Sequence, residues 1–118
     1  MNLEIQKKEM RDSLQEYMNR FIPGMQKIVL WFQQGEEQKA LEGMVDVVEG
    51  LAWICEAISL TQELYSTPIN IEGINEFLIQ LNDGLVESDS ILMADILEYE
   101  IIPIVEEWNK IIMGNIVN

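Results

Sequence analysis

The sequence predicts an all-α protein, arranged as an antiparallel four-helix bundle whose long first and fourth helices are kinked by proline. Three observations support this fold class. Apolar residues recur at alternating steps of three and four in four separate segments, which is the spacing of near-parallel helix packing. No alternating strand pattern of useful length occurs, and turn residues separate the four segments. We expect a single domain over residues 1–118.

The first helix is predicted over residues 4–33. Gln33, Gln34 and Gly35 suit its C-terminus, because glycine can adopt the left-handed conformation that ends many helices. Pro23 and Gly24 fall inside it and predict a kink, with a full break favoured at this pair. Its apolar seam is Leu14, Met18, Phe21, Met25, Ile28 and Phe32.

The second helix is predicted over residues 36–65. Pro68 removes Thr67 from helical geometry and so separates this helix from the next. Its predicted seam is Leu41, Met44, Val48, Leu51, Cys55, Ile58 and, past Gln62, Tyr65.

The third helix is predicted over residues 71–86, with Asn70 as its cap, and the fourth over residues 89–115, with Ser88 or Asp89 as its cap. Pro103 predicts a kink in the fourth helix, because proline lacks the donor for the carbonyl four residues earlier. The third seam is Ile71, Ile74, Leu78, Leu81 and Leu85; the fourth is Ala94, Leu97, Ile101, Ile104, Trp108 and Ile111.

The predicted helix lengths do not match. The third helix would be roughly 24 Å long and the others roughly 40–45 Å, so it cannot cover its neighbours from end to end. Either the first helix folds back at Pro23, or another chain covers the exposed apolar area. The residues left without cover would be Ile28, Val29, Trp31, Phe32, Met44, Val45 and Val48.

The charge is strongly negative and unevenly distributed. The formal net charge is -14, yet five of the seven basic residues fall within residues 1–27. Direct nucleic-acid binding needs a basic face, so we expect none. An acidic inhibitor that mimics nucleic acid remains an alternative function. A single cysteine, and the absence of an apolar stretch of about 20 residues, predict a cytoplasmic protein without membrane contact.

A second apolar arc lies opposite the seam of the fourth helix, edged by carboxylates. In one interpretation this arc packs against another helix of the same chain. In the other it docks a partner helix or a second subunit, with Tyr99 as an anchor and the acids selecting a basic partner. The candidate partner-binding residues are Leu92, Asp95, Ile96, Glu98, Tyr99, Ile102 and Glu106.

Enzymatic and metal-binding patterns are weak. The chain has no histidine, so the usual general base, a zinc site and the Glu-x-x-His pairs of di-iron bundles all lack their key residue. Glu56 with Glu63, and Asp46 with Glu49, could share a helix face, which keeps a carboxylate–metal bundle as a second alternative. We expect no enzyme and no cofactor.

The run Leu92–Pro103 and the following Glu106-Glu107-Trp108 resemble the C-terminal signature of an uncharacterised family of small acidic all-helical proteins from spore-forming bacteria. Some members of that family lie near motility genes, so the resemblance implies an association with motility. It implies no catalytic residues. Size, acidity and helical pattern are also similar in kind to flagellar export chaperones, at the level of the fold only.

Together these observations predict a non-enzymatic interaction protein, an adaptor or chaperone-like binder of a helical or basic partner. We also expect the chain to self-associate as a homodimer.

Overall fold

The computed structural model describes residues 2–117, with side chains described as far as Gly114, and over this range it is all-helical and has no strand. Four helices account for most of the chain, and the last of them contains a π-helical turn. We call this last unit, from Ser90 to Val117, the C-terminal helix. The elements are α1 (Leu3–Gln33), α2 (Glu37–Thr61), η1 (Gln62–Leu64), η2 (Glu72–Ile74), α3 (Asn75–Val86), α4 (Ser90–Ile96), the π turn η3 (Leu97–Ile101) and α5 (Ile102–Val117).

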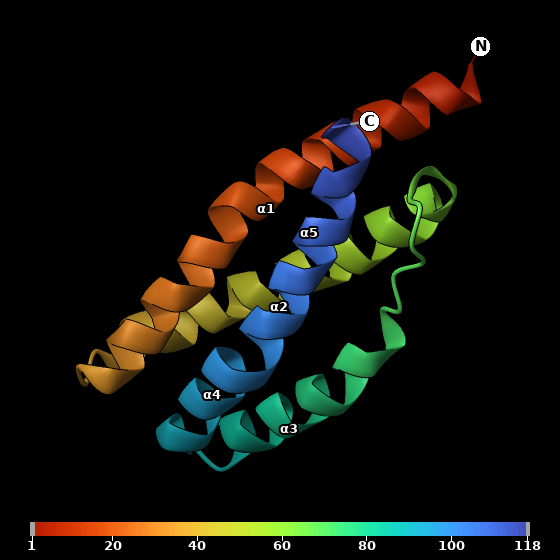
Figure 1. Ribbon diagram of the computed structural model, residues 1–118. Coiled ribbons are helices and arrows are strands. Elements are labelled where there is room, and N and C mark those ends of the chain that lie inside the picture. Colours follow the sequence, from red (N-terminus) through yellow and green to blue (C-terminus); the bar gives the residue numbers. More distant parts are fainter. Residues whose placement is uncertain (1, 118) are drawn as a thin grey trace.

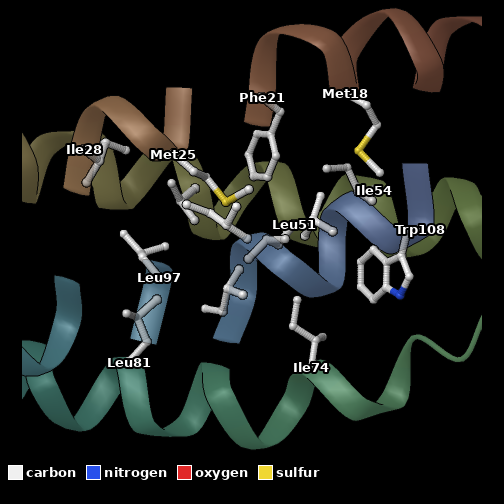
Figure 2. Close-up of a cluster of buried hydrophobic side chains, with 14 of the residues drawn as sticks. Met18, Phe21, Met25, Ile28, Leu51, Ile54, Ile74, Leu81, Leu97 and Trp108 are labelled. Atoms are coloured by element: carbon white, nitrogen blue, oxygen red, sulfur yellow. The ribbon is translucent and has the colours of Figure 1, made fainter. Parts of the chain in front are cut away.

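The helices form an elongated body of 48 × 24 × 23 Å. Helices α1 and α2 form a pair, and the C-terminal helix lies between this pair and α3 (Figure 1). One cluster of buried apolar side chains receives residues from every helix, including Met25, Leu51, Leu81 and Trp108 (Figure 2). The short α3 is therefore joined to the rest mainly through the C-terminal helix.

Helix α1 begins at a side-chain cap and runs without interruption. The Asn2 side-chain oxygen accepts hydrogen bonds from the backbone amides of Glu4 and Ile5, at 3.0 and 3.3 Å. All six residues of the predicted seam are buried. The favoured break at Pro23-Gly24 is wrong, because the helix continues through both residues. Burial of one α1 face against two neighbouring helices offsets the cost of an internal proline.

A tight turn joins α1 to α2, as the sequence predicts. Gly35 has a φ of 79°, and the amide of Glu36 donates to the carbonyl of Trp31 at 2.8 Å. This is the left-handed helix ending that glycine favours.

The buried stripe of α2 differs from the predicted one. Met44, Leu51, Ile58 and Tyr65 are buried as expected, but Leu41 and Val48 are exposed. The predicted spacing is correct, but Leu41 and Val48 are each one residue away from a buried position. Small residues can occupy buried positions, and the pattern considered only large ones. The buried residues of α2 are Ala40, Met44, Val47, Gly50, Leu51, Ile54, Ala57, Ile58 and Thr61.

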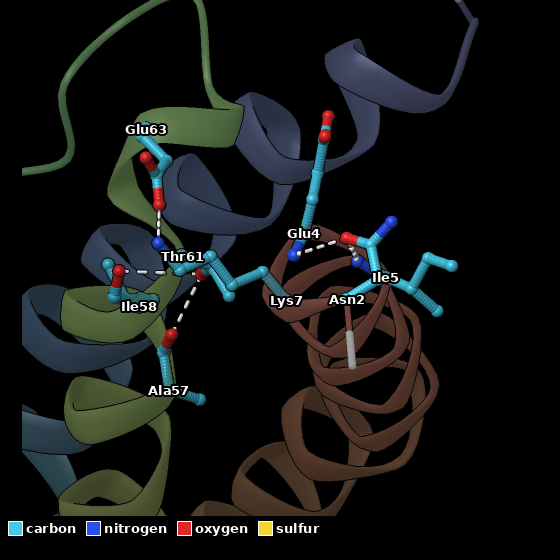
Figure 3. Close-up of polar contacts among 8 residues, drawn as sticks. All are labelled: Asn2, Glu4, Ile5, Lys7, Ala57, Ile58, Thr61 and Glu63. Atoms are coloured by element: carbon cyan, nitrogen blue, oxygen red, sulfur yellow. Dashed lines mark hydrogen bonds and ion pairs between the residues drawn. The ribbon is translucent and has the colours of Figure 1, made fainter.

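Polar side chains close the far end of α2 (Figure 3). The Thr61 hydroxyl donates to the carbonyl of Ala57 and forms a 2.7 Å hydrogen bond with the Tyr65 hydroxyl. Lys7 of α1 forms an ion pair with Glu63. Further along, the Asn70 side chain accepts from the amide of Glu72 at 3.0 Å. Asn70 therefore stabilises the turn before η2 and does not cap α3, which begins after η2 at Asn75, four residues later than predicted.

The C-terminal helix begins where the sequence predicts and widens before its proline. The Asp89 side chain accepts from the amide of Leu92 at 3.0 Å, which identifies Asp89 as the cap. At η3 the amide of Ile102 donates to the carbonyl of Leu97, five residues back instead of four. Pro103 follows immediately. The predicted distortion therefore takes the form of a π turn, a recognised cause of helix kinks.

The expected gap in the core is mostly covered. Ile28, Val29 and Met44 are buried, although α1 does not fold back. Helix α2 and the C-terminal helix supply the cover, because both pack along α1. Of the residues expected to lack cover, Val45 and Val48 are exposed by 57% and 45%, and Trp31 is half-buried.

Candidate functional site

The predicted partner-binding arc does not form one continuous surface. Ile96 and Ile102 are buried, at 5% and 6% exposure, whereas the Tyr99 side chain is 66% exposed. Leu92 is half-buried. Among the acids, Asp95 and Glu106 are exposed and Glu98 is half-buried. Two of the arc's apolar residues therefore belong to the core, and Tyr99 is its exposed aromatic residue.

The π turn explains why Ile102 was misplaced. In a regular α-helix each residue turns by about 100°, which would put Ile102 roughly 140° away from the buried Leu97. A π turn takes more residues per revolution, so Ile102 rotates back toward the core. The predicted arc was based on regular α-helical geometry, in which Ile102 would lie on the outer surface.

Two acids of the arc, Glu98 and Glu106, border a groove between α1 and the C-terminal helix, whereas Asp95 and Tyr99 lie outside its lining. This groove has a volume of about 410 Å³. Its apolar floor includes Val29 and Ile102, Leu30 stands exposed at its α1 edge, and no basic residue lines it. We call it the acidic groove and define it by Gln26, Val29, Leu30, Glu98, Ile102 and Glu106.

The electrostatic environment of Tyr99 reflects the same acids. The Glu98 carboxylate, through a side-chain hydrogen bond and through its charge, raises the pKa of Tyr99 above its ordinary value; a smaller contribution comes from Asp95. The Tyr99 hydroxyl therefore donates to Glu98, while most of the side chain stays exposed.

A second groove lies on the other side of α1, against α2, and the sequence pattern did not reveal it. Its main hollow, of about 290 Å³, has an apolar floor that includes Met25 and Val47. Beyond Tyr17 the groove continues into a further hollow that Trp53 borders. We call the two together the aromatic groove and define it by Tyr17, Arg20, Gly24, Lys27 and Trp31 of α1 with Gly43, Asp46, Glu49, Gly50 and Trp53 of α2.

Two glycines of α2 create this groove by letting the helices approach closely. A Cβ atom added to Gly50 would lie 2.5 Å from both the Phe21 ring and the Tyr17 hydroxyl. One added to Gly43 would lie 2.7 Å from a side-chain carbon of Ile28. The two glycines are seven residues apart, so they lie on one face of α2. This spacing is the signal in the sequence that could have identified the close helix pair.

Aromatic rings and cations line the edges of the aromatic groove. The rings of Tyr17 and Trp53 meet edge to face, with centroids 5.2 Å apart. The Arg20 guanidinium lies 5.8 Å from the Tyr17 ring centroid, and the Lys27 ammonium lies 5.3 Å from that of Trp31. Burial and the charge of Asp46 raise the pKa of Tyr17, while Arg20 acts in the opposite direction.

The residues considered for metal binding or catalysis are dispersed. Within the described part of the chain, no three carboxylate or cysteine side chains are placed to share a metal ion. Glu63 is engaged by Lys7, and Glu56 is exposed. Burial raises the pKa of the Cys55 thiol, which lowers its reactivity. None of the described helices combines the length and apolar character needed to cross a membrane.

The sequence region that builds both grooves matches a known family model. A model described as a domain of unknown function, DUF8042, covers residues 9–111. The chain belongs to the DUF8042 family. Every residue that defines the acidic groove and the aromatic groove lies inside this DUF8042 domain. No curated protein and no solved structure matches the chain.

Proposed function

We propose that the protein is a non-enzymatic interaction module that binds a basic, amphipathic helix of a partner protein, as an adaptor or chaperone-like protein. The acidic groove is the observation that carries this proposal. It combines an apolar floor with the carboxylates of Glu98 and Glu106 and contains no cation.

The chemistry of the groove fits a helix with apolar and basic faces. Leu30, exposed by 51%, would contact the apolar side chains of such a helix, and the exposed Tyr99, next to Glu98 but outside the groove lining, would extend that contact. Lysine or arginine on its flanks would meet Glu98 and Glu106. The net charge of -14 would attract a basic partner over longer distances and raise its association rate.

The proposal includes an antiparallel four-helix bundle acting in the cytoplasm, and the link to motility that the sequence resemblance implies. Heptad spacing in all four helices and the pairing of α1 with both α2 and the C-terminal helix support the bundle.

The direct test uses two synthetic peptides. An amphipathic helix of leucine and lysine should bind in fluorescence anisotropy, and the same peptide with glutamate in place of every lysine should not. Glu98→Gln combined with Glu106→Gln should weaken binding about tenfold, because two partly desolvated charge pairs are lost. The matched control is Glu76→Gln with Glu87→Gln, which removes the same charge from exposed positions outside the groove.

Tyr99→Ala is the second variant. It should weaken peptide binding while unfolding remains within about 0.5 kcal/mol of the wild type, because Tyr99 is exposed. Equal loss of affinity in the groove variant and in the Glu76/Glu87 control would contradict the proposal. That result, together with steeply salt-dependent binding to a DNA-binding protein, would favour the nucleic-acid mimic instead.

A further inference from the structure

The cations of the aromatic groove are exceptional in this protein. Within the side chains that the structure describes, Lys7, Lys8, Arg11, Lys39 and Lys110 each form an ion pair with a carboxylate. Arg20 and Lys27 form none, although the chain holds 21 acidic residues. Both lie on α1 at the same edge of the aromatic groove.

The opposite edge of this groove carries unpaired acids. Asp46 and Glu49 of α2 are exposed and form no ion pair with any described residue. The groove thus has cations along α1, carboxylates along α2, and aromatic rings and glycines between them. The formal charges of these two cations and two carboxylates sum to zero, in a chain whose net charge is -14.

A face of this kind is complementary to itself. Rotation by 180° about an axis parallel to the groove places α1 of one chain over α2 of a second chain. The glycine contacts fix the levels along the groove, because Gly50 lies opposite Tyr17 and Gly43 opposite Ile28. Along the groove, Arg20 therefore lies at the same height as Glu49, and Lys27 lies nearer to the height of Asp46 than to that of Glu49. An interface with one such axis is closed and yields a dimer.

We propose that the aromatic groove is the interface of a symmetric homodimer, in which Arg20 meets the partner's Glu49 and Lys27 meets the partner's Asp46. Tyr17, Trp31 and Trp53 from both chains fill the hollows between these pairs. Tryptophan, tyrosine and arginine are the residues that most often dominate interface energies. Outside the aromatic groove the chain holds 19 of its 21 acidic residues and five of its seven basic ones, so a second copy would meet more like charge there.

The size of the face sets the expected affinity. Residues 17–31 of α1 extend over about 21 Å, and two helices of about 10 Å diameter give a width of about 20 Å. These dimensions give a face of about 420 Å², roughly half of the about 800 Å² per partner of a standard interface. We therefore expect a dissociation constant in the micromolar range.

Gly24 provides the sharpest test. Nothing lies within 4 Å of a Cβ atom added at Gly24, so Gly24→Leu fills the groove without disturbing the contacts of α1. In sedimentation equilibrium the wild type should shift from the mass of one chain to that of two as its concentration rises. Gly24→Leu should weaken this association at least about tenfold while keeping its helical circular dichroism and without lowering its thermal midpoint.

A charge exchange tests the pairing itself. Arg20→Glu should weaken association about tenfold, and Arg20→Glu combined with Glu49→Arg should restore it, because the opposed charges are exchanged in both chains. Lys110→Glu is the matched control. It changes the net charge equally, but at an exposed position outside the groove, and should leave the dissociation constant within about threefold of the wild type.

Tryptophan emission reports the same event at the groove. Association should shift the emission of Trp31 and Trp53 to shorter wavelength as water leaves their rings. The proposal would be overturned if the wild type stayed monomeric at protein concentrations of several hundred micromolar. It would also be overturned if Gly24→Leu associated as well as the wild type. Neither result affects binding of the leucine–lysine peptide, because the acidic groove lies on the other side of α1.

Discussion

Helix α1 meets a different kind of neighbour on each of its two sides. Against α2, two glycines bring the backbones together and push the large side chains Tyr17 and Trp53 out to the edges of the contact. Against the C-terminal helix, branched side chains such as Val29 and Ile102 fill the contact themselves, and acids form its rim. The two sides of α1 thus differ in how the contact is filled and in the charge of its edges: mixed charges and aromatic rings beside α2, and acids beside the C-terminal helix.

Truncating a buried side chain on the side of the C-terminal helix should have the largest effect on stability. Ile101 is fully buried at the π turn, so Ile101→Ala leaves a cavity and should lower the free energy of unfolding by about 2–5 kcal/mol in urea denaturation. Ile91→Ala is the matched control, since Ile91 is 77% exposed in the same helical unit and its loss should cost less than about 0.5 kcal/mol. Similar costs for both would mean that α1 and the C-terminal helix do not share this core.

Enlarging a glycine on the α2 side should have the second-largest effect on stability. Gly50→Leu forces Phe21 and Tyr17 to move and should destabilise the fold by about 1–3 kcal/mol, measured by the shift of the urea midpoint. Gly24→Leu, a change of the same type where space is open, is expected to leave the midpoint unchanged or slightly raised, because leucine also removes the helix penalty of glycine. An unaffected midpoint in Gly50→Leu would show that the two helices are not held close by this glycine.

A smaller change should stabilise the protein. Gly24→Ala removes the helix penalty of glycine at a position without neighbours and should raise the free energy of unfolding by about 0.5–1 kcal/mol. Gly43→Ala gains the same propensity but crowds Ile28, so it should give no stabilisation. At low protein concentration, Gly24→Ala should therefore have a higher thermal midpoint than Gly43→Ala. Equal midpoints would mean that α2 does not approach α1 closely at Gly43.

The smallest effect concerns the tyrosines of the two sides. Burial chiefly raises the pKa of Tyr17, whereas Glu98 chiefly raises the pKa of Tyr99. A phenol with a raised folded-state pKa stabilises the fold below its unfolded pKa near 10, and this contribution is lost as pH rises through the folded-state pKa. Glu98→Gln should therefore lower the pKa of Tyr99 in an NMR titration and leave that of Tyr17 unchanged.

The sequence predicted the helical class and the α1 seam well, because only large apolar residues occupy the buried positions from Leu14 to Phe32. It assigned part of the α2 stripe incorrectly. Ala40 and Gly50 are buried there while Leu41 is exposed, and small residues give a weak hydropathy signal. Pro103 signalled a distortion, but no residue pattern specified a π turn, so the position of Ile102 could not be derived.

The acidic rim of the candidate site could be read from the sequence, since Glu98 and Glu106 line a groove in the structure. The floor of that groove could not, because Val29 and Leu30 come from a helix far away in the chain. The aromatic groove was missed for a related reason. Its walls come from two helices, and the glycines that bring them together have no side chains to form a pattern.

The π turn has a consequence for the register of the whole C-terminal helix. Before the turn, α4 packs against both α1 and α3, and Met93 lies over Gly84 of α3. After it, α5 packs along α1 and buries Trp108. One additional residue in η3 rotates the helix, so that Leu97 before the turn and Ile102 after it both face the core. The C-terminal helix thereby stays packed on α1 through α4, η3 and α5 without a loop between its halves.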